Sequence, residues 1–197
     1  MVIAHHLILG VYSFWLPNDP RGSWSNYVGS RRLLHFGTAT KTDTRRSVSA
    51  VSHDVSRRLA AKQAMTLAPV RITGVQARAV ARGFANLINK TRIQVFSCAI
   101  LPDHAHLVIS RHDYEVEKIA NLLKGEATKQ VLREHLHPFA SKTKPGKRPH
   151  TMWARGHWKV FLNNANDVRR AIQYVEQNPI KDGKPFQRWW FVTPYDE

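Results

Sequence analysis

The spacing of hydrophobic and polar residues predicts a chain in which strands alternate with helices. Runs rich in β-branched and aromatic residues predict strands at residues 3–15, 92–100, 104–111 and 153–162. Apolar positions three and four residues apart predict helices at residues 52–65, 74–89, 114–136 and 164–177. A length of 197 residues fits one domain, with enough chain to enclose a hydrophobic core.

A hairpin within this pattern places two histidines next to each other. Its turn lies at Pro102 and Asp103, and the second strand begins on a histidine. Because side chains alternate along a strand, one face carries His104, His106 and Val108, and the other carries Ala105, Leu107 and Ile109. Two neutral imidazoles held side by side form half of a site for a divalent cation, which needs one or two further ligands. The alternative is a hairpin whose two histidines lie on a solvated face.

The last predicted helix carries a second candidate group. Pro179 is expected to end this helix near residue 177. Tyr174 and Asn178 are four residues apart, so they lie one turn apart at the edge of the buried stripe of the helix. Tyr174 is either a packing residue with its hydroxyl in water or a nucleophile. In the second case Asn178 would offer its amide oxygen to the same metal as the two histidines.

The composition indicates nucleic acid as a partner. The chain has 30 Lys and Arg against 14 Asp and Glu, a formal charge of +16 and a pI near 10.6. A membrane surface is the competing partner, but the sequence shows no long basic amphipathic helix. Cys98 is the single cysteine, which excludes a disulfide framework and a cysteine-based zinc site. The apolar run at residues 5–16 is too short to span a bilayer and lacks signal-peptide features, so we expect a cytoplasmic protein.

Two basic segments interrupt the predicted elements. Residues 23–52 form a Ser-, Thr-, Gly- and Arg-rich insertion, and residues 138–149 form a basic loop between prolines. In the first segment basic residues are interleaved with aromatic ones. This composition suits single-stranded nucleic acid, because the charges contact phosphates and the rings stack on bases. The alternative is a solvated loop without a binding role.

The histidine pair and the tyrosine together resemble a known family. His104-Ala105-His106, on a strand after Leu-Pro-Asp, is similar to the HUH motif, a histidine pair with one hydrophobic residue between. The sequence from Tyr174 to Gly183 resembles the tyrosine-helix signature of the single-tyrosine HUH transposases. The resemblance is greatest to the REP-associated tyrosine transposases and their insertion-sequence relatives. It extends from about the N-terminus to Gly183, and residues 16–22, 76–80 and 123–126 agree with it.

The resemblance implies a fold and a reaction. The fold is α+β, a ferredoxin-like antiparallel sheet with helices on one face, which is the HUH endonuclease architecture. In that architecture the histidine pair lies on a central strand and faces the tyrosine helix. Tyr174 would attack a phosphodiester of single-stranded DNA, form a 5′-phosphotyrosine link and release a 3′-hydroxyl. By the same resemblance His104, His106 and Asn178 would hold one Mg²⁺ or Mn²⁺.

The family also implies a DNA hairpin as a partner, recognised beside the cleavage site. The residues expected to contact DNA are Arg21, Trp24, Arg31, Arg32, Lys124, Lys129, Arg155, Trp158 and Lys159. The resemblance is compatible with a monomer and with a homodimer. The chain departs from the insertion-sequence relatives at Asn178, where those relatives often have glutamine, and in its long segment at residues 23–72.

Two other functions compete with this interpretation. A hairpin DNA-binding module without strand-transfer activity can use the same fold, but it does not need His104, His106 and Tyr174. A small-molecule phosphate hydrolase of the histidine-triad type needs a third histidine where this chain has Val108, and it gives no reason for a charge of +16. We therefore expect a single-domain, metal-dependent DNA transposase and endonuclease.

Overall fold

The computed structural model describes residues 1–19, 31–38 and 53–196. Its centre is a four-stranded sheet with the strand order β2-β3-β1-β4, in which each pair of neighbours is antiparallel. The strands are β1 (Ala4–Gly10), β2 (Val95–Ile100), β3 (His104–Ser110) and β4 (Trp158–Leu162). The central strands are therefore β1 and β3, and β3 carries the histidine pair.

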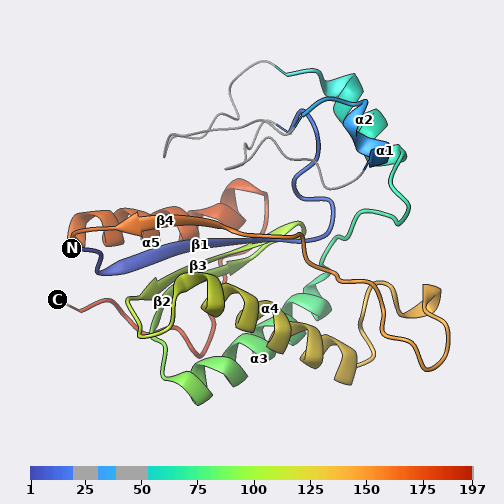
Figure 1. The fold of residues 1–197 in the computed structure, drawn as a ribbon. Helices are drawn as coiled ribbons and strands as arrows, with labels where there is room; N and C mark the ends of the chain where they lie inside the picture. Colours follow the sequence, from blue (N-terminus) through green and yellow to red (C-terminus); the bar gives the residue numbers. More distant parts are fainter. Residues whose placement is uncertain (20–30, 39–52, 197) are drawn as a thin grey trace.

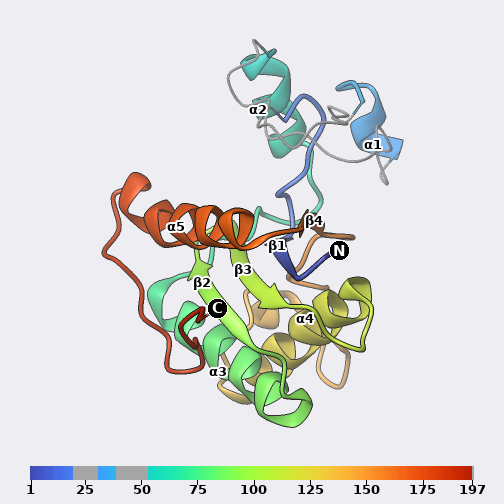
Figure 2. The same cartoon turned by 90° about the vertical axis from the view of Figure 1, so that its left-hand side faces the viewer.

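Helices cover both faces of the sheet. α3 (Gly74–Thr91) and α4 (Val116–Arg133) pack against each other below it, and α5 (Ala165–Lys181) lies across the opposite face (Figures 1 and 2). The order β1-α3-β2-β3-α4-β4 with this strand arrangement is ferredoxin-like, so the predicted fold class is confirmed. The expected helices on one face are α3 and α4, and the tyrosine helix α5 adds a third layer on the opposite face, which the expectation of one covered face did not include.

Three short helices lie outside these layers. α1 (Arg31–Leu34) and α2 (Val55–Gln63) lie away from the sheet, beyond the end where β1 finishes (Figure 1). The 3-10 helix η1 (Ala140–Lys142) is part of the basic loop that follows α4. Most of the predicted basic insertion at residues 23–52 falls outside the described residues, apart from the stretch that contains α1.

The alternation of side chains along the strands gives the molecule two hydrophobic cores. Leu7, Leu107 and Ile109 point toward α3 and α4, and together with Phe84 they belong to the larger core. Val108 points to the opposite face and belongs to a smaller core beneath α5. The predicted division of the hairpin into an apolar face and a histidine face is therefore correct.

Some of the predicted strands extend beyond the ends of the observed strands. β1 ends at Gly10 and not at residue 15, because the chain turns there: Phe14 N–H donates to the carbonyl of Val11 (2.9 Å), and Ser13 has a φ of 79°. β2 begins at Val95 and not at residue 92, because Arg92 ends α3 in the left-handed conformation, with a φ of 59°.

The last strand and the last helix also differ from the prediction. A bend at Gly156, with a φ of 66°, delays β4 until Trp158, and Trp153 forms only an isolated bridge with Val11. α5 continues past Pro179 to Lys181. A proline in the last turn costs one backbone hydrogen bond. Burial of the Pro179 side chain offsets this loss and favours the helical conformation.

Candidate active site

A row of closely spaced polar side chains lies on the face of the sheet that α5 covers. Nε2 of His104 lies 2.8 Å from Nε2 of His106. The other ring nitrogen of His106, Nδ1, lies 2.9 Å from Nε2 of His6 on β1. At the opposite end of the row, Nδ1 of His104 donates to the carboxylate of Asp103 over 2.6 Å. The row therefore runs from Asp103 through His104 and His106 to His6.

The register of the two central strands brings His6 to this position. His6 pairs with Val108 and Ile8 pairs with His106, so His6 and His106 are diagonal neighbours on one face of the sheet. The sequence pattern did not single out His6. A histidine on the first strand was visible, but whether it shares a face with the pair on β3 depends on the pairing register, which a single sequence does not give.

Burial keeps His106 and His6 neutral. Only 2% of His106 and 8% of His6 is exposed to solvent. Burial, together with the neighbouring His104 and His6, holds the pKa of His106 well below its usual range. Burial and His104 lower the pKa of His6 to about 4. Both rings are therefore neutral near pH 7, the form in which an imidazole offers a lone pair to a metal ion.

The hydrogen bonds fit a divalent cation between His104 and His106. Since the Asp103 carboxylate can only accept, His104 carries its proton on Nδ1 and has a lone pair on Nε2. His106 presents its own Nε2 to the same point, and its outer nitrogen is held by His6. Adjacent ligands of an octahedral ion at about 2.1 Å lie about 3 Å apart, close to the observed separation. Outer partners that orient each ring are typical of histidine metal ligands.

Tyr174 lies directly over this row. Its ring centroid is 5.6 Å from that of His106 and 5.7 Å from that of His6, in edge-to-face geometry. The residue is 46% exposed, so one side of the ring packs on the histidines while the rest faces solvent. Although 68 residues separate Tyr174 from His106 in the sequence, the fold brings them together as predicted.

Local interactions of α5 place Tyr174 there. The side chain of Asn164 accepts from the N–H of Asp167 (2.9 Å) and caps the start of the helix. Val168, Ala171 and Val175 follow at helical spacing and pack in the smaller core, against the face of the sheet that carries Val108. Tyr174 is at the edge of this stripe, next to Val175.

Asn178 lies one turn beyond the tyrosine. Its side-chain N–H donates to the carbonyl oxygen of Tyr174 over 2.9 Å, and this bond does not use the amide oxygen that would bind a metal. Within the described residues, no group of three or more His, Cys, Asp or Glu side chains is arranged to hold a metal ion. A cation on the histidine pair would therefore depend on other oxygens, such as an amide or a phosphate. The role of Asn178 stays a prediction.

An aromatic side chain supports the outer histidine. The ring of Phe14 packs on that of His104 with 4.9 Å between centroids. Gly10, which pairs with His104 across the sheet, leaves room for this contact, because a Cβ there would lie 2.6 Å from the Phe14 ring. The turn after β1 thus contributes to the position of His104.

The residues expected to contact DNA lie in different environments. Arg21 and Trp24 lie outside the described residues. Arg31 and Arg32 on α1 are exposed, and so is Arg155. Lys129 is exposed and forms an ion pair with Glu126 (2.8 Å).

The other three of these residues are more enclosed. Lys159 is half-buried, points toward α4 and forms an ion pair with Glu117. Trp158 is half-buried on β4. Lys124 is 8% exposed, and its ammonium donates to backbone carbonyls. DNA contact by any of the nine stays a prediction.

The family of the chain follows from a comparison with known protein families. Residues 70–178 match the family model described as "Transposase IS200 like", which is more than half of the chain. The chain belongs to the IS200-like transposase family. The matched segment contains both histidines of the pair and Tyr174, and it ends at Asn178, whereas His6 lies outside it.

The remaining comparisons add little to the family assignment. One solved structure similar to this IS200-like chain is described as "Structure of the REP associates tyrosine transposase bound to a REP hairpin". The two chains are 11% identical, with a TM-score of 0.47, and the match covers 91% of this chain and 68% of the other. No protein of curated function matches the sequence. No helix in the described part of the chain is long and apolar enough to cross a membrane.

Proposed function

We propose that the protein is a metal-dependent transposase that cleaves and rejoins single-stranded DNA through Tyr174. The observation that carries the proposal is the position of the Tyr174 ring, 5.6 Å from the ring of His106, in a histidine pair whose Nε2 atoms lie 2.8 Å apart. A half-exposed tyrosine beside candidate metal ligands is the arrangement that phosphoryl transfer to a phenol requires. Membership of the IS200-like transposase family supports the same reaction.

In the proposed reaction the Tyr174 oxygen attacks a backbone phosphorus. The phenol loses its proton, a bond forms between its oxygen and phosphorus, and the bond from phosphorus to the 3′-oxygen breaks. The 3′-oxygen leaves and becomes a hydroxyl by taking a proton, while the 5′-phosphate stays on the tyrosine. Attack by the 3′-hydroxyl of another strand reverses these bonds and joins new ends.

The histidine row prepares the site for this attack. His104 and His106 would hold Mg²⁺ or Mn²⁺ through their Nε2 atoms, with the Asn178 amide oxygen as a further ligand. When bound, such an ion supplies positive charge that polarises the phosphate and stabilises the charge that develops in the reaction. Asp103 and His6 hold the outer nitrogens of the two rings and keep the Nε2 atoms turned toward each other.

The charge of the chain supports a DNA substrate. A formal charge of +16 exceeds what a small phosphorylated substrate requires, and it suits the repeated phosphates of a DNA backbone. Exposed arginines on α1 and at Arg155 are candidates for contacts with a hairpin beside the cleavage site. The histidine pair and Tyr174 come from one chain, so the site as described can form in a monomer or in each subunit of a dimer.

A covalent-adduct assay tests the proposal. Labelled single-stranded DNA from the flanks of the gene is incubated with the protein and Mn²⁺ and separated on a denaturing protein gel. We expect a metal-dependent covalent band that is lost in Tyr174→Phe and retained in Tyr114→Phe, the control, whose half-exposed tyrosine lies on a different segment. DNA binding without a covalent band in the wild-type protein would contradict the proposal and favour the hairpin-binding module.

A further inference from the structure

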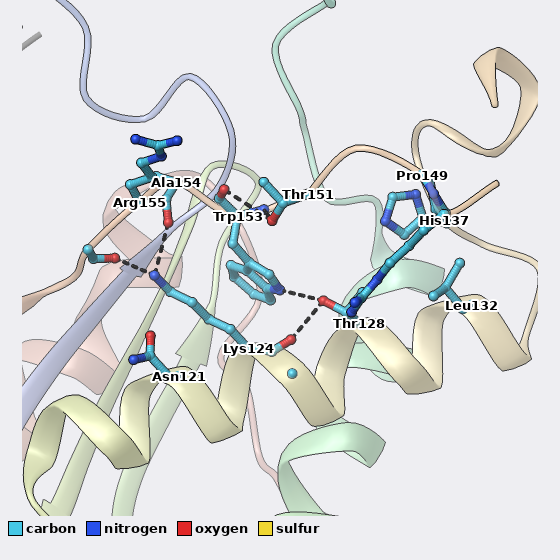
Figure 3. Close-up of a pocket in the computed structure, with 13 residues that line it drawn as sticks. Asn121, Lys124, Thr128, Leu132, His137, Pro149, Thr151, Trp153, Ala154 and Arg155 are labelled. Carbon is cyan, nitrogen blue, oxygen red and sulfur yellow. Dashed lines mark hydrogen bonds between the residues drawn. The ribbon is translucent and has the colours of Figure 1, made fainter. Parts of the chain in front are cut away.

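A second candidate site lies between α4 and the segment that leads into β4. A cavity of about 580 Å³ opens there (Figure 3), and α4 lies on the side of the sheet opposite α5 (Figure 1). Four of the side chains that line it carry basic nitrogens: Lys124, His137, Arg148 and Arg155. None of the described residues in its lining is acidic. The cavity is thus lined by positive charge that no lining carboxylate balances.

Lys124 is a buried cation in the wall of this cavity. Its ammonium donates to the backbone carbonyl oxygens of Ala154 (3.0 Å) and Gly156, which use two of its three N–H groups (Figure 3). It forms no ion pair with a carboxylate of the described residues, and burial lowers its pKa to about 8. Because burial of an unpaired charge is unfavourable, an anion in the cavity would stabilise this lysine.

His137 offers an unused donor to the same cavity. The residue is 5% exposed, and its Nδ1 accepts a hydrogen bond from the N–H of Phe139 over 3.3 Å. The neutral ring therefore carries its proton on Nε2, and Nε2 is buried without a partner among the described residues. A buried N–H without an acceptor is unfavourable unless a ligand provides one.

The other two basic residues are available for a ligand. Within the described part of the chain, Arg148 and Arg155 form no ion pair, and Arg148 is exposed. Arg155 lies at the rim of the cavity, with its guanidinium turned away from Lys124 (Figure 3). An anion that enters the cavity would find two buried donors inside and arginine at the entrance.

The cavity wall is connected to the candidate active site. The N–H of Ala154, whose carbonyl binds Lys124, donates to the carbonyl of Gly10 over 2.9 Å. Gly10 is the residue that pairs with His104 across the sheet. The wall segment is further fixed by Trp153, whose indole N–H donates to the hydroxyl of Thr128 over 3.1 Å (Figure 3). The wall of the cavity and the histidine row therefore both contact Gly10, at the end of β1.

We propose that this cavity binds one nucleotide of the DNA substrate, with its backbone phosphate against His137 and Arg148. The proposal rests on the proposed function for the identity of the ligand as DNA. A phosphodiester supplies an acceptor oxygen for the free N–H of His137, together with the negative charge that the lining lacks. The volume falls within the range of small-ligand sites, about 300–1,000 Å³, which leaves room for the sugar and base.

A phosphate-by-phosphate binding scan tests this site. Each backbone phosphate of the single-stranded DNA is replaced in turn by a neutral methylphosphonate, and affinity for the Tyr174→Phe protein is measured in EDTA. Neither metal nor the tyrosine hydroxyl is needed in this assay, so it can be interpreted even if Tyr174 is not the nucleophile. We expect one position at which neutralisation weakens binding about tenfold, as for the loss of a charge-assisted phosphate contact.

The decisive comparison uses Arg148→Gln in the same background. Arg148 is exposed and forms no ion pair with the described residues, so the variant is expected to fold. In this variant, neutralising that one phosphate should weaken binding by about threefold or less, while the loss of affinity on neutralising each other phosphate should be unchanged. Arg78→Gln, which removes an exposed arginine from α3, is the charge-matched control and should leave the whole profile unchanged.

Three results would overturn the proposal. Identical profiles in Arg148→Gln and Arg78→Gln would show that no single phosphate depends on the cavity. Binding of inorganic phosphate that Arg148→Gln abolishes, together with an unchanged DNA profile, would identify a site for free anions only. Failure of the parent protein to bind DNA at all would contradict both this site and the proposed function.

Discussion

The imidazole of His6 hydrogen-bonds to the imidazole of His106, with 2.9 Å between Nε2 of the first and Nδ1 of the second. If His106 is to present a lone pair on Nε2, its proton must be on Nδ1, and His6 must accept it there. His6 thus offers the acceptor that the metal-binding tautomer of His106 needs, although it lies 100 residues away in the sequence. Asp103 does the same for His104 from the adjacent position.

Removal of this partner should weaken metal binding. We expect His6→Ala to lower the affinity for Mn²⁺ about 10- to 100-fold, as measured by titration calorimetry without DNA. His5→Ala is the matched control, because His5 pairs with Ile109 and points to the opposite face of the sheet. Equal Mn²⁺ affinity in His6→Ala and His5→Ala would show that His6 does not orient the site.

The close contact between α3 and α4 depends on Gly83. A Cβ at this position would lie 2.5 Å from Cα of Ala127, on the backbone of α4, which cannot move aside without separating the helices. We expect Gly83→Ala to lower the free energy of unfolding by about 1–3 kcal/mol, measured by urea denaturation.

Gly125→Ala on α4 provides the control for this prediction. A Cβ there meets no atom within 4 Å, so the substitution should stabilise the helix by up to about 1 kcal/mol. If Gly83→Ala and Gly125→Ala changed the free energy of unfolding in the same direction, close packing at Gly83 would not explain the effect of Gly83→Ala.

An ion pair between α3 and α4 should give a pH dependence at low pH. The Arg82 guanidinium binds the Glu134 carboxylate through two hydrogen bonds, of 2.7 and 2.5 Å. This contact lowers the pKa of Glu134 from 4.5 to about 2. Because the folded-state pKa is lowered, the stabilisation is complete above pH 4.5 and is lost as the pH falls toward 2.

Glu134→Gln should remove this dependence. Since the pair is partly exposed to solvent, we expect a loss of only about 1 kcal/mol in the free energy of unfolding at pH 7. The difference from wild type should shrink between pH 4.5 and 2, as followed by urea denaturation at each pH. Glu176→Gln, at an exposed position on α5, should show no such convergence. A difference that stays constant down to pH 2 would contradict the assignment.

Local patterns in the sequence were sufficient for much of the fold. The alternation around His104 and His106 predicted which face of β3 is apolar, and the helical spacing of Val168, Ala171 and Val175 predicted the buried side of α5. These features depend on neighbours in the chain. Element ends were less accurate, because the left-handed conformation of Arg92 and the turn at Ser13 have no clear sequence signal.

The parts that depend on register or on distant contacts were not predictable. The place of His6 in the histidine row follows from the pairing of β1 with β3. The burial of Lys124 follows from carbonyl groups 30 and 32 residues farther along the chain. A lysine on a helix pattern is usually solvated, and only the fold shows that this one lines a cavity.

The most direct test of the central claim is to identify the residue that carries DNA. The covalent complex formed with Mn²⁺ is digested with trypsin and nuclease, and the nucleotide-linked peptide is sequenced by mass spectrometry. Cleavage after Arg170 and Lys181 isolates residues 171–181, in which Tyr174 is the single tyrosine. We predict a 5′-phosphonucleotide on Tyr174 in this peptide. A nucleotide on a peptide that contains Tyr114 or Tyr195 instead would contradict the assignment of Tyr174 as the nucleophile.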